Sequence, residues 1–411
     1  MRNFLSVATL TLMSFLCNSA HANTTLTFKQ ALVIAYRNNP ELQAEIDKAQ
    51  ALKGFFIQSK LYPNPQLALT AENIGGSGAY SGYESAETTL SITQPIPLGH
   101  RLKYLQNATY ADYMASLARI KVNKTTLYIA VGNAYIDTLY AEQWYIVTKK
   151  LTGVSQDIVS AIKRRVVAGA GAELDLRLAE LRLGEAQIQK NKAGREALIQ
   201  RAKLARFLGN GLTVEQHLTD AGLKHEQWLW PNLLKKIGLS PQLLEKQLQM
   251  NAKRATIMAV KKAIIPDLNI QLGARHFSDD GSNAAVISAY SQLPVYERNQ
   301  GKIMTAEAEF TQTLHELRST YLEVKQNLYT ALLQAQQGRF EADLVTNTLL
   351  PLSRKSLRVA KEGYQMGRYT YIELSTALNA LFEEERHYQQ AHADYHKALM
   401  QINGILGFDG Q

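Results

Sequence analysis

The residues best suited to bind a metal ion are two histidines near the C-terminus. His392 and His396 are four residues apart, so a helix would present both imidazoles on one face. His387 and Asp394 are close in sequence, but the segment has no HExxH pattern and no cluster of methionines. We favour a solvated or interhelical polar face for this pair, with a metal site as the alternative. The chain offers no nucleophile with its base, metal triad or phosphate loop, so we expect no enzyme and no cofactor.

Two acidic residues, Asp175 and Glu373, occupy matching positions of an internal repeat. An offset of 198 residues relates them, and the same offset relates Gly169 to Gly367 just upstream. Each acidic residue therefore follows a glycine-marked break and falls in the first turn of a helix. A carboxylate there can complement the helix macrodipole and cap free backbone N–H groups, which is the alternative to a functional role for either residue.

The repeat extends well beyond these positions. The same offset of 198 relates Gln94 to Gln292 and the dipeptide 208–209 to 406–407. A period this long is too large for a solenoid. It indicates two pseudo-equivalent halves around a shared axis, an arrangement common in membrane-embedded transport proteins.

Residues 1–22 have the features of a signal peptide. An apolar stretch over 4–16 is followed by the small-x-small cleavage signal Ala20-His21-Ala22. The only cysteine, Cys17, lies inside this segment, so cleavage after Ala22 would leave a chain that forms no disulfide. Retention of Cys17 as a lipidated first residue is the alternative, which the bulky residue before it disfavours.

The chain is basic, with a formal net charge of +9, but its charges are spread without a dense Lys/Arg run. Nucleic acid is therefore not an expected partner. No segment after the signal peptide approaches 18 consecutive apolar residues, which argues against a transmembrane helix in the mature chain. Only a β-barrel, whose alternating strands escape a hydropathy window, could then span a membrane.

Long helices are predicted between the few prolines. Residues 101–167 are predicted to form one helix, on the order of 100 Å long at 1.5 Å per residue. After each glycine-marked break, apolar and alanine residues recur with a period of 3.5, which predicts closely packed helical hairpins. Pro351 interrupts the first helix of the second hairpin and should kink or split it. The run 383–386 is interpreted as exposed helix surface.

Two pairs of short strands are predicted, over 65–97 and 266–297, because apolar and polar residues alternate there. Each pair would have one apolar and one polar face. Four strands cannot close a barrel, and open edges would be unsatisfied in lipid, so closure needs more than one chain. A small soluble sheet packed on helices is the alternative.

The order helix, strand pair and helical hairpin, repeated once, resembles the TolC-like outer-membrane efflux family. The resemblance rests on 32–42, on Gln94-Pro95-Ile96-Pro97, and on the segments that begin at Gly169 and Gly367. The segment 293–301 resembles the strand-to-helix motif of the branch paired with heavy-metal pumps. The fold class implied is mainly α with a small β part.

This resemblance implies a homotrimer, with a 12-stranded barrel in the outer membrane and an α-helical tunnel through the periplasm. It divides the mature chain into a first repeat (23–209), an equatorial connection (210–239) and a second repeat (240–411). The implied function is a passive export duct that works with an inner-membrane RND pump and a periplasmic adaptor, with heavy-metal cations as the expected cargo. Drug efflux or type I secretion by the same fold, and a periplasmic hairpin adaptor or scaffold, are the alternatives.

The resemblance also suggests roles for individual residues. The periplasmic gate candidates are Asp175, Glu373, Arg368 and Tyr369. The adaptor-docking candidates at the tips are Gly169, Gly367 and Thr370, and the barrel anchors in the outer lipid interface are Tyr80 and Tyr83. A ring of like-charged carboxylates at the gate would favour cations.

Overall fold

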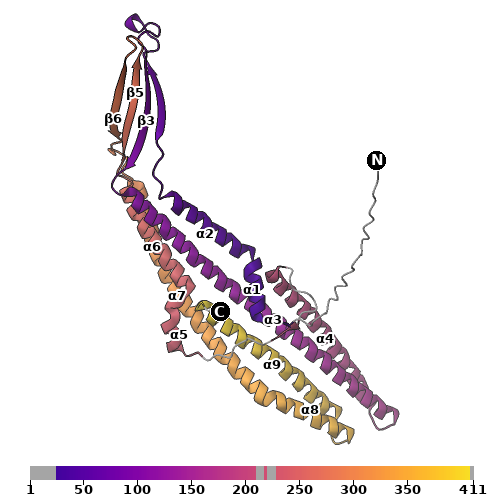
Figure 1. Cartoon of the computed structure of the whole chain (residues 1–411). Coiled ribbons are helices and arrows are strands. Elements are labelled where there is room, and N and C mark those ends of the chain that lie inside the picture. Colours follow the sequence, from indigo (N-terminus) through magenta and orange to yellow (C-terminus); the bar gives the residue numbers. More distant parts are fainter. Residues whose placement is uncertain (1–24, 210–216, 220–227, 408–411) are drawn as a thin grey trace, which may run out of the picture.

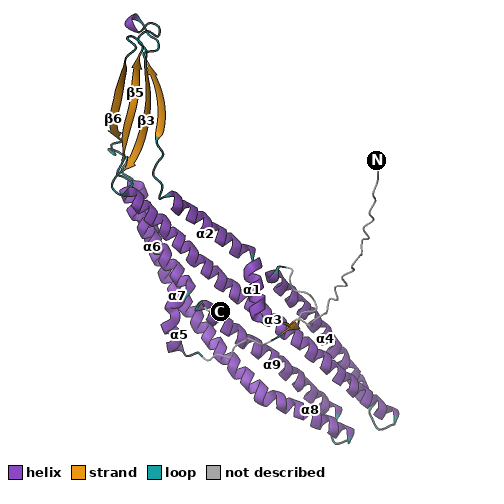
Figure 2. Ribbon diagram, in the orientation of Figure 1, coloured by secondary structure: helices purple, strands orange, loops and turns teal. Residues whose placement is uncertain are grey.

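The computed structural model describes residues 25–209, 217–219 and 228–407. The molecule is elongated, with one β-sheet at one end and a long helical body that ends in two hairpin tips (Figure 1). The prediction of a mainly α chain with a small β part is confirmed (Figure 2). The predicted signal peptide and Cys17 lie outside the described residues. Among the described helices, none combines the length and apolar character needed to cross a membrane.

The sheet joins strands from both halves of the repeat. It consists of β2 (Gln66–Glu72), β3 (Glu87–Pro97), β5 (Asp267–Phe277) and β6 (Asn283–Ser291), in that order and antiparallel throughout. The two predicted strand pairs are thus two hairpins fused side by side through β3 and β5.

One face of the sheet is apolar and exposed, and the other is polar. Residues that are paired across neighbouring strands point to the same side, so the register groups a set of large apolar side chains on one face. These residues are Leu67, Leu69, Leu90, Ile92, Leu272 and Ile287. Thr89, Ser91 and Thr93 alternate with them and are buried on the other face. The predicted alternation is confirmed.

The part of the body nearest the sheet is formed by α2 (Pro40–Gln58), α3 (Arg101–Val167), α6 (Pro241–Lys262) and α7 (Gln300–Leu344). Helix α1 (Phe28–Asn38) precedes α2 and lies midway along the body (Figure 1). The prediction of one helix over 101–167 is confirmed, since α3 runs for 67 residues without a break. It packs against α2 and α6, and α6 packs in turn against α7.

The far part of the body holds the two hairpins. In the first, α3 turns back into α4 (Glu173–Leu208); in the second, α8 (Leu350–Gln365) turns back into α9 (Tyr371–Ile405). The predicted interruption at Pro351 is confirmed: a turn of π-helix over Val345–Leu349 separates α7 from α8. Proline has no N–H to donate and its ring crowds the preceding turn, which accounts for the wider turn here.

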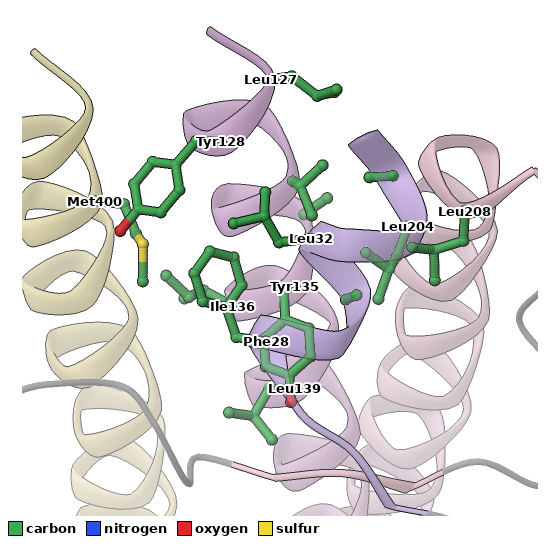
Figure 3. Close-up of a cluster of buried hydrophobic side chains, with 14 of the residues drawn as sticks. Phe28, Leu32, Leu127, Tyr128, Tyr135, Ile136, Leu139, Leu204, Leu208 and Met400 are labelled. Carbon is green, nitrogen blue, oxygen red and sulfur yellow. The ribbon is translucent and has the colours of Figure 1, made fainter. Parts of the chain in front are cut away.

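The largest core cluster lies where the halves meet midway along the body (Figure 3). Phe28 of α1 contacts Tyr128 and Tyr135 of α3 edge to face, with ring centroids 5.5 and 5.8 Å apart. The Tyr135 hydroxyl donates to the carbonyl of Leu26 at 2.6 Å and accepts from the N–H of Thr219 at 3.1 Å. This aromatic centre fixes α1 and the short parallel pair β1 (Thr25–Leu26) and β4 (His217–Leu218) against α3.

The connection predicted over 210–239 is described only in part. It includes β4, a short helix α5 (Trp230–Lys236) and a 3-10 turn over Ile237–Leu239. Trp230 contacts Tyr329 of α7 edge to face, at 5.0 Å between ring centroids. Helix α5 therefore packs against the second half, whereas β4 pairs with β1 of the first half.

Candidate functional site

Both hairpin tips end their first helix in the same way. Gly169 and Gly367 have positive φ angles of 70° and 73°. Gly169 donates its N–H to Val166, and Ala170 donates to Arg165. The same two bonds recur in the second tip, from Gly367 and from the residue after it. This is the Schellman motif, in which a left-handed residue lets the chain satisfy the last carbonyls of a helix. The backbone alone explains both glycines, and their role in adaptor docking stays a prediction.

The tips differ in where they place their large side chains. In the second tip, a Cβ on Gly363 would lie 2.0 Å from Cδ2 of Tyr369, so the Tyr369 ring lies directly against that glycine. In the first tip, Arg165 takes the position of Gly363 and Gly171 takes the position of Tyr369, so the large residue and the glycine are exchanged. Because Gly171 brings no ring to cover the last turn of α3, the Arg165 side chain is free to reach outward.

Arg165 links the two tips. Its guanidinium donates to the carbonyl of Tyr364 and, at 3.5 Å, to that of Gln365, both in the last turn of α8. It also donates to the carbonyl of Ala170 in its own tip at 3.2 Å. The guanidinium carbon lies 5.0 Å from the centroid of the Tyr364 ring. A cation at a helix C-terminus is favoured by the macrodipole, so Arg165 is held by the end of α8.

Tyr364 carries the link on to α4. Its side chain is buried, and its hydroxyl approaches Oδ2 of Asp175 at 3.5 Å. Burial raises the pKa of the Tyr364 phenol, and the Asp175 carboxylate adds to that shift. The phenol therefore keeps its proton for donation to Asp175. We call Arg165, Tyr364 and Asp175 the tip clamp, because together they connect α3 and α4 with α8.

Glu373 forms its hydrogen bonds within its own tip. Its carboxylate accepts from the N–H of Thr370 at 2.7 Å and from the Thr370 hydroxyl at 2.9 Å. Thr370 in return accepts from the N–H of Glu373 at 3.3 Å, which completes a capping box at the start of α9. These bonds hold the pKa of Glu373 below its usual range. They therefore stabilise the folded protein fully above the pKa that Glu373 has in the unfolded chain, and this stabilisation is lost as the pH falls through its pKa in the folded protein. The capping interpretation of Glu373 is correct; its role in a gate stays a prediction.

The cap and the gate can be separated by two substitutions. Glu373→Gln keeps a side chain that can complete a capping box but removes the charge. Thr370→Ala breaks the box and keeps the charge, at a cost of about 1 kcal/mol of stability. If Glu373 belongs to the gate, Glu373→Gln should weaken the cation preference of single channels while Thr370→Ala should not. An unchanged preference in Glu373→Gln, together with a lower melting temperature in Thr370→Ala, would leave the cap as its function.

The remaining tip candidates lie close to these groups. Arg368 is exposed, and its N–H completes the second Schellman motif. Tyr369 covers Gly363, as described above. Arg165 and Tyr364 were not identified from the sequence, because the predictions considered charged residues and glycines that occur at the same position in both halves. Positions at which the halves differ carry the signal, since Arg165 aligns with a glycine in the second half.

His392 and His396 lie between helices. His396 is buried, and the Tyr140 ring of α3 stacks near both imidazoles, at 6.4 and 6.3 Å between centroids. Nε2 of His392 lies 3.1 Å from Oγ1 of Thr346 in the π-helical turn. In the part of the chain that the structure describes, no group of three or more His, Cys, Asp or Glu residues could hold a metal ion. The interhelical interpretation therefore accounts for the pair.

One surface prediction was wrong. Within 383–386, Glu385 is buried, and its carboxylate accepts from Nη2 of Arg354 in α8 at 2.7 Å. The helix period turns this residue of α9 toward α8, so its charge needs a partner there. The pair contributes to holding α8 against α9.

Tyr80 and Tyr83 lie in the connection between β2 and β3, at the end of the sheet far from the helices (Figure 1). Both side chains are exposed. This position is compatible with the predicted anchoring in a lipid interface, which stays a prediction.

Comparisons with known proteins identify a matching family and several similar proteins. The family model described as "Outer membrane efflux protein" matches residues 31–210 and 235–408. The cobalt-zinc-cadmium resistance protein CzcC of Cupriavidus metallidurans is 25% identical over 390 residues, which are 93% of this chain and 90% of that protein. The nickel and cobalt resistance protein CnrC of the same organism is 22% identical, over 74% of this chain and 72% of its own length.

Solved structures show the same fold. The CusC crystal structure aligns with a TM-score of 0.77 at 19% identity, over 92% of this chain and 91% of that one. The outer membrane protein VceC of Vibrio cholerae aligns with a TM-score of 0.76 at 15% identity, over 92% and 96% of the two chains. The elongated arrangement of one sheet and two helical hairpins is thus shared with these proteins.

Proposed function

Because the chain belongs to the outer membrane efflux protein family, we propose that three copies form a passive export duct through the outer membrane and the periplasm. In this proposal an inner-membrane RND pump and a periplasmic adaptor deliver the cargo, and the duct performs no reaction. The observation that carries the proposal is the sheet: an exposed apolar face, a polar opposite face and two open edges, standing on a long helical body.

The sheet edges support assembly from several copies. Within the described chain, β2 and β6 each have a neighbour on one side only. Unpaired backbone groups at such edges are costly in lipid, and pairing β6 of one copy with β2 of the next would satisfy them. Three copies would supply about 12 strands, with the apolar side toward lipid and the polar side toward a water-filled lumen.

The helical body has a matching unpaired stripe. Large apolar side chains are exposed along α7, the last helix of the row α2, α3, α6 and α7. The stripe consists of Leu314, Tyr321, Leu322, Leu333 and Phe340. Such a stripe would be covered by the first helices of the next copy, so that the helices also close into a tunnel.

The gate is proposed at the hairpin tips. The tip clamp restrains α8 against α3 and α4 through one guanidinium and one phenol. These few polar bonds form a link that can be broken and remade, whereas the packed seams of each hairpin cannot separate without exposing apolar surface. Engagement of the adaptor and pump would release the clamp and let α8 and α9 move.

Divalent metal cations are the proposed cargo. The support is the printed names of relatives, which include resistance to cobalt, zinc, cadmium and nickel. Other relatives of about 20% identity are named for pyoverdine export and toluene efflux. Deletion of the gene should therefore raise sensitivity to cobalt, zinc or cadmium more than sensitivity to drugs, and the intact gene should restore resistance.

The sensitivity assay tests the proposed cargo, and the oligomeric state of the purified protein tests the proposed duct. Increased sensitivity to drugs alone would overturn the proposed cargo but keep the duct. A purified protein that is a monomer without detergent would overturn the duct itself. A heat-modifiable trimer that needs detergent is the result expected.

A further inference from the structure

We propose that Arg275 sets the ion preference of the outer end of the duct, by neutralising one of two carboxylates that face each other on the polar side of the sheet. The inference rests on the proposed function, because it takes the polar face to line the lumen. It concerns the end of the sheet far from the helices, where β2 ends and β3 begins (Figure 1).

Three bonds fix the Arg275 side chain across three strands. From β5, Nη2 donates to Oε2 of Glu72 on β2 at 2.8 Å, and Nη1 donates to Oε2 of Glu87 on β3 at 2.5 Å. Nε donates to Oγ1 of Thr89 at 2.9 Å. The planar guanidinium reaches all three acceptors at once, which an ammonium group could not do.

The two carboxylates need this cation. Glu72 and Glu87 are directly opposite each other in the register of β2 and β3. Like charges at such a cross-strand pair are destabilising. The bridge from Arg275 removes that repulsion and leaves the cluster with a net charge of −1 from its three formal charges.

Arg275 is the only Lys or Arg in the four described strands of the sheet. The next layer of the polar face is neutral, since Gln271 donates to Ser91 and accepts from Ser288. His276 points to the other face and contacts Asn283. The acidic groups beyond the cluster, Glu84, Asp279 and Asp280, are in the exposed turns.

A ring of three such clusters would therefore be weakly negative. Its charge depends on Arg275: loss of the cation takes each cluster from −1 to −2, and loss of one carboxylate takes it to 0. A wide, water-filled pore still discriminates between ions through the fixed charges on its wall. The cluster is thus expected to favour cations modestly, which suits a duct for metal cations.

The test is a charge series measured as reversal potentials of purified channels in planar bilayers under a potassium chloride gradient. Arg275→Gln should raise the cation-to-anion permeability ratio about fivefold. One unit charge at about 8 Å in water changes the local concentration of a monovalent ion about twofold, upward for the cation and downward for the anion. Glu72→Gln should lower the ratio by a similar factor. Arg275→Lys keeps the positive charge but replaces the planar guanidinium with an ammonium group, and it should retain the wild-type ratio.

Controls separate charge from folding and from the proposed function. Lys302→Gln removes a positive charge from an exposed side chain at the helical end of the sheet and should leave the ratio unchanged. Each variant is first checked for the heat-modifiable trimer. An equal ratio throughout the series, or a shift in Arg275→Lys as large as in Arg275→Gln, would overturn the inference. Absence of channels from the wild-type protein would instead overturn the proposed function.

Discussion

Replacement of Arg165 by methionine is expected to leave the duct open at rest. The substitution keeps an unbranched apolar stem but removes every bond from the guanidinium to Tyr364, Gln365 and Ala170. A hydrogen bond from a charged donor contributes about 1.5–3 kcal/mol, so loss of the link should raise the ratio of open to closed channels about 10- to 100-fold. Single-channel conductance should rise, and cells should become more sensitive to antibiotics that leak through an open duct.

The neighbouring arginine provides a matched control. Arg164 is exposed, and no described residue accepts a hydrogen bond from its side chain. Arg164→Met should therefore conduct like the wild type. Tyr364→Phe removes only the hydroxyl contact with Asp175 and should open the duct less than Arg165→Met does. Equal conductance in Arg164→Met and Arg165→Met would show that the tip clamp does not restrain the gate.

A charge on the apolar face of the sheet is expected to abolish assembly in the membrane. Leu69 is 71% exposed in the single chain and belongs to the face that we place against lipid. An arginine at the bilayer midplane of a barrel costs about 2–4 kcal/mol, and a trimer would carry three of them. Leu69→Arg should thus eliminate the heat-modifiable trimer from outer-membrane fractions.

A substitution at the adjacent residue tests whether the effect of arginine depends on the face of the sheet. Thr70 is next to Leu69 on β2, pairs with Thr89, and points to the polar side. Thr70→Arg adds the same charge at nearly the same depth and should still assemble. Loss of the trimer in both variants would indicate a general intolerance of β2 to arginine, and its retention in both would contradict a lipid-facing surface.

The long-range order of the chain could be predicted from the sequence because it depends on local periodicity. The absence of prolines predicted α3 from end to end, and Pro351 predicted the interruption before α8. The period of 3.5 predicted the helices that follow each tip, α4 and α9. Alternation predicted the strands and their two faces. The junction of the two hairpins through β3 and β5 depends on pairing between residues about 180 positions apart, such as Ile92 and Leu272, which no local pattern records.

The site was predicted less completely, for a related reason. The repeat pointed to the tips and to Asp175 and Glu373, but it placed these two residues in equivalent roles. The structure gives Asp175 a partner on another hairpin and gives Glu373 a partner three residues away. Glu373 could be interpreted as a cap from sequence, because the capping box is a local pattern.

The sequence by itself determined the two pseudo-equivalent halves, their helices and strands, and the glycines that reverse the chain at each tip. These features follow from backbone preferences and from periodicity within single elements. Only the tertiary structure decided which residues of the two halves contact each other. Arg165 and Tyr364 meet because α3 and α8 end side by side, and Arg275 lies between two carboxylates because three strands align there. Contacts between distant segments depend on packing and register, which are properties of the whole fold.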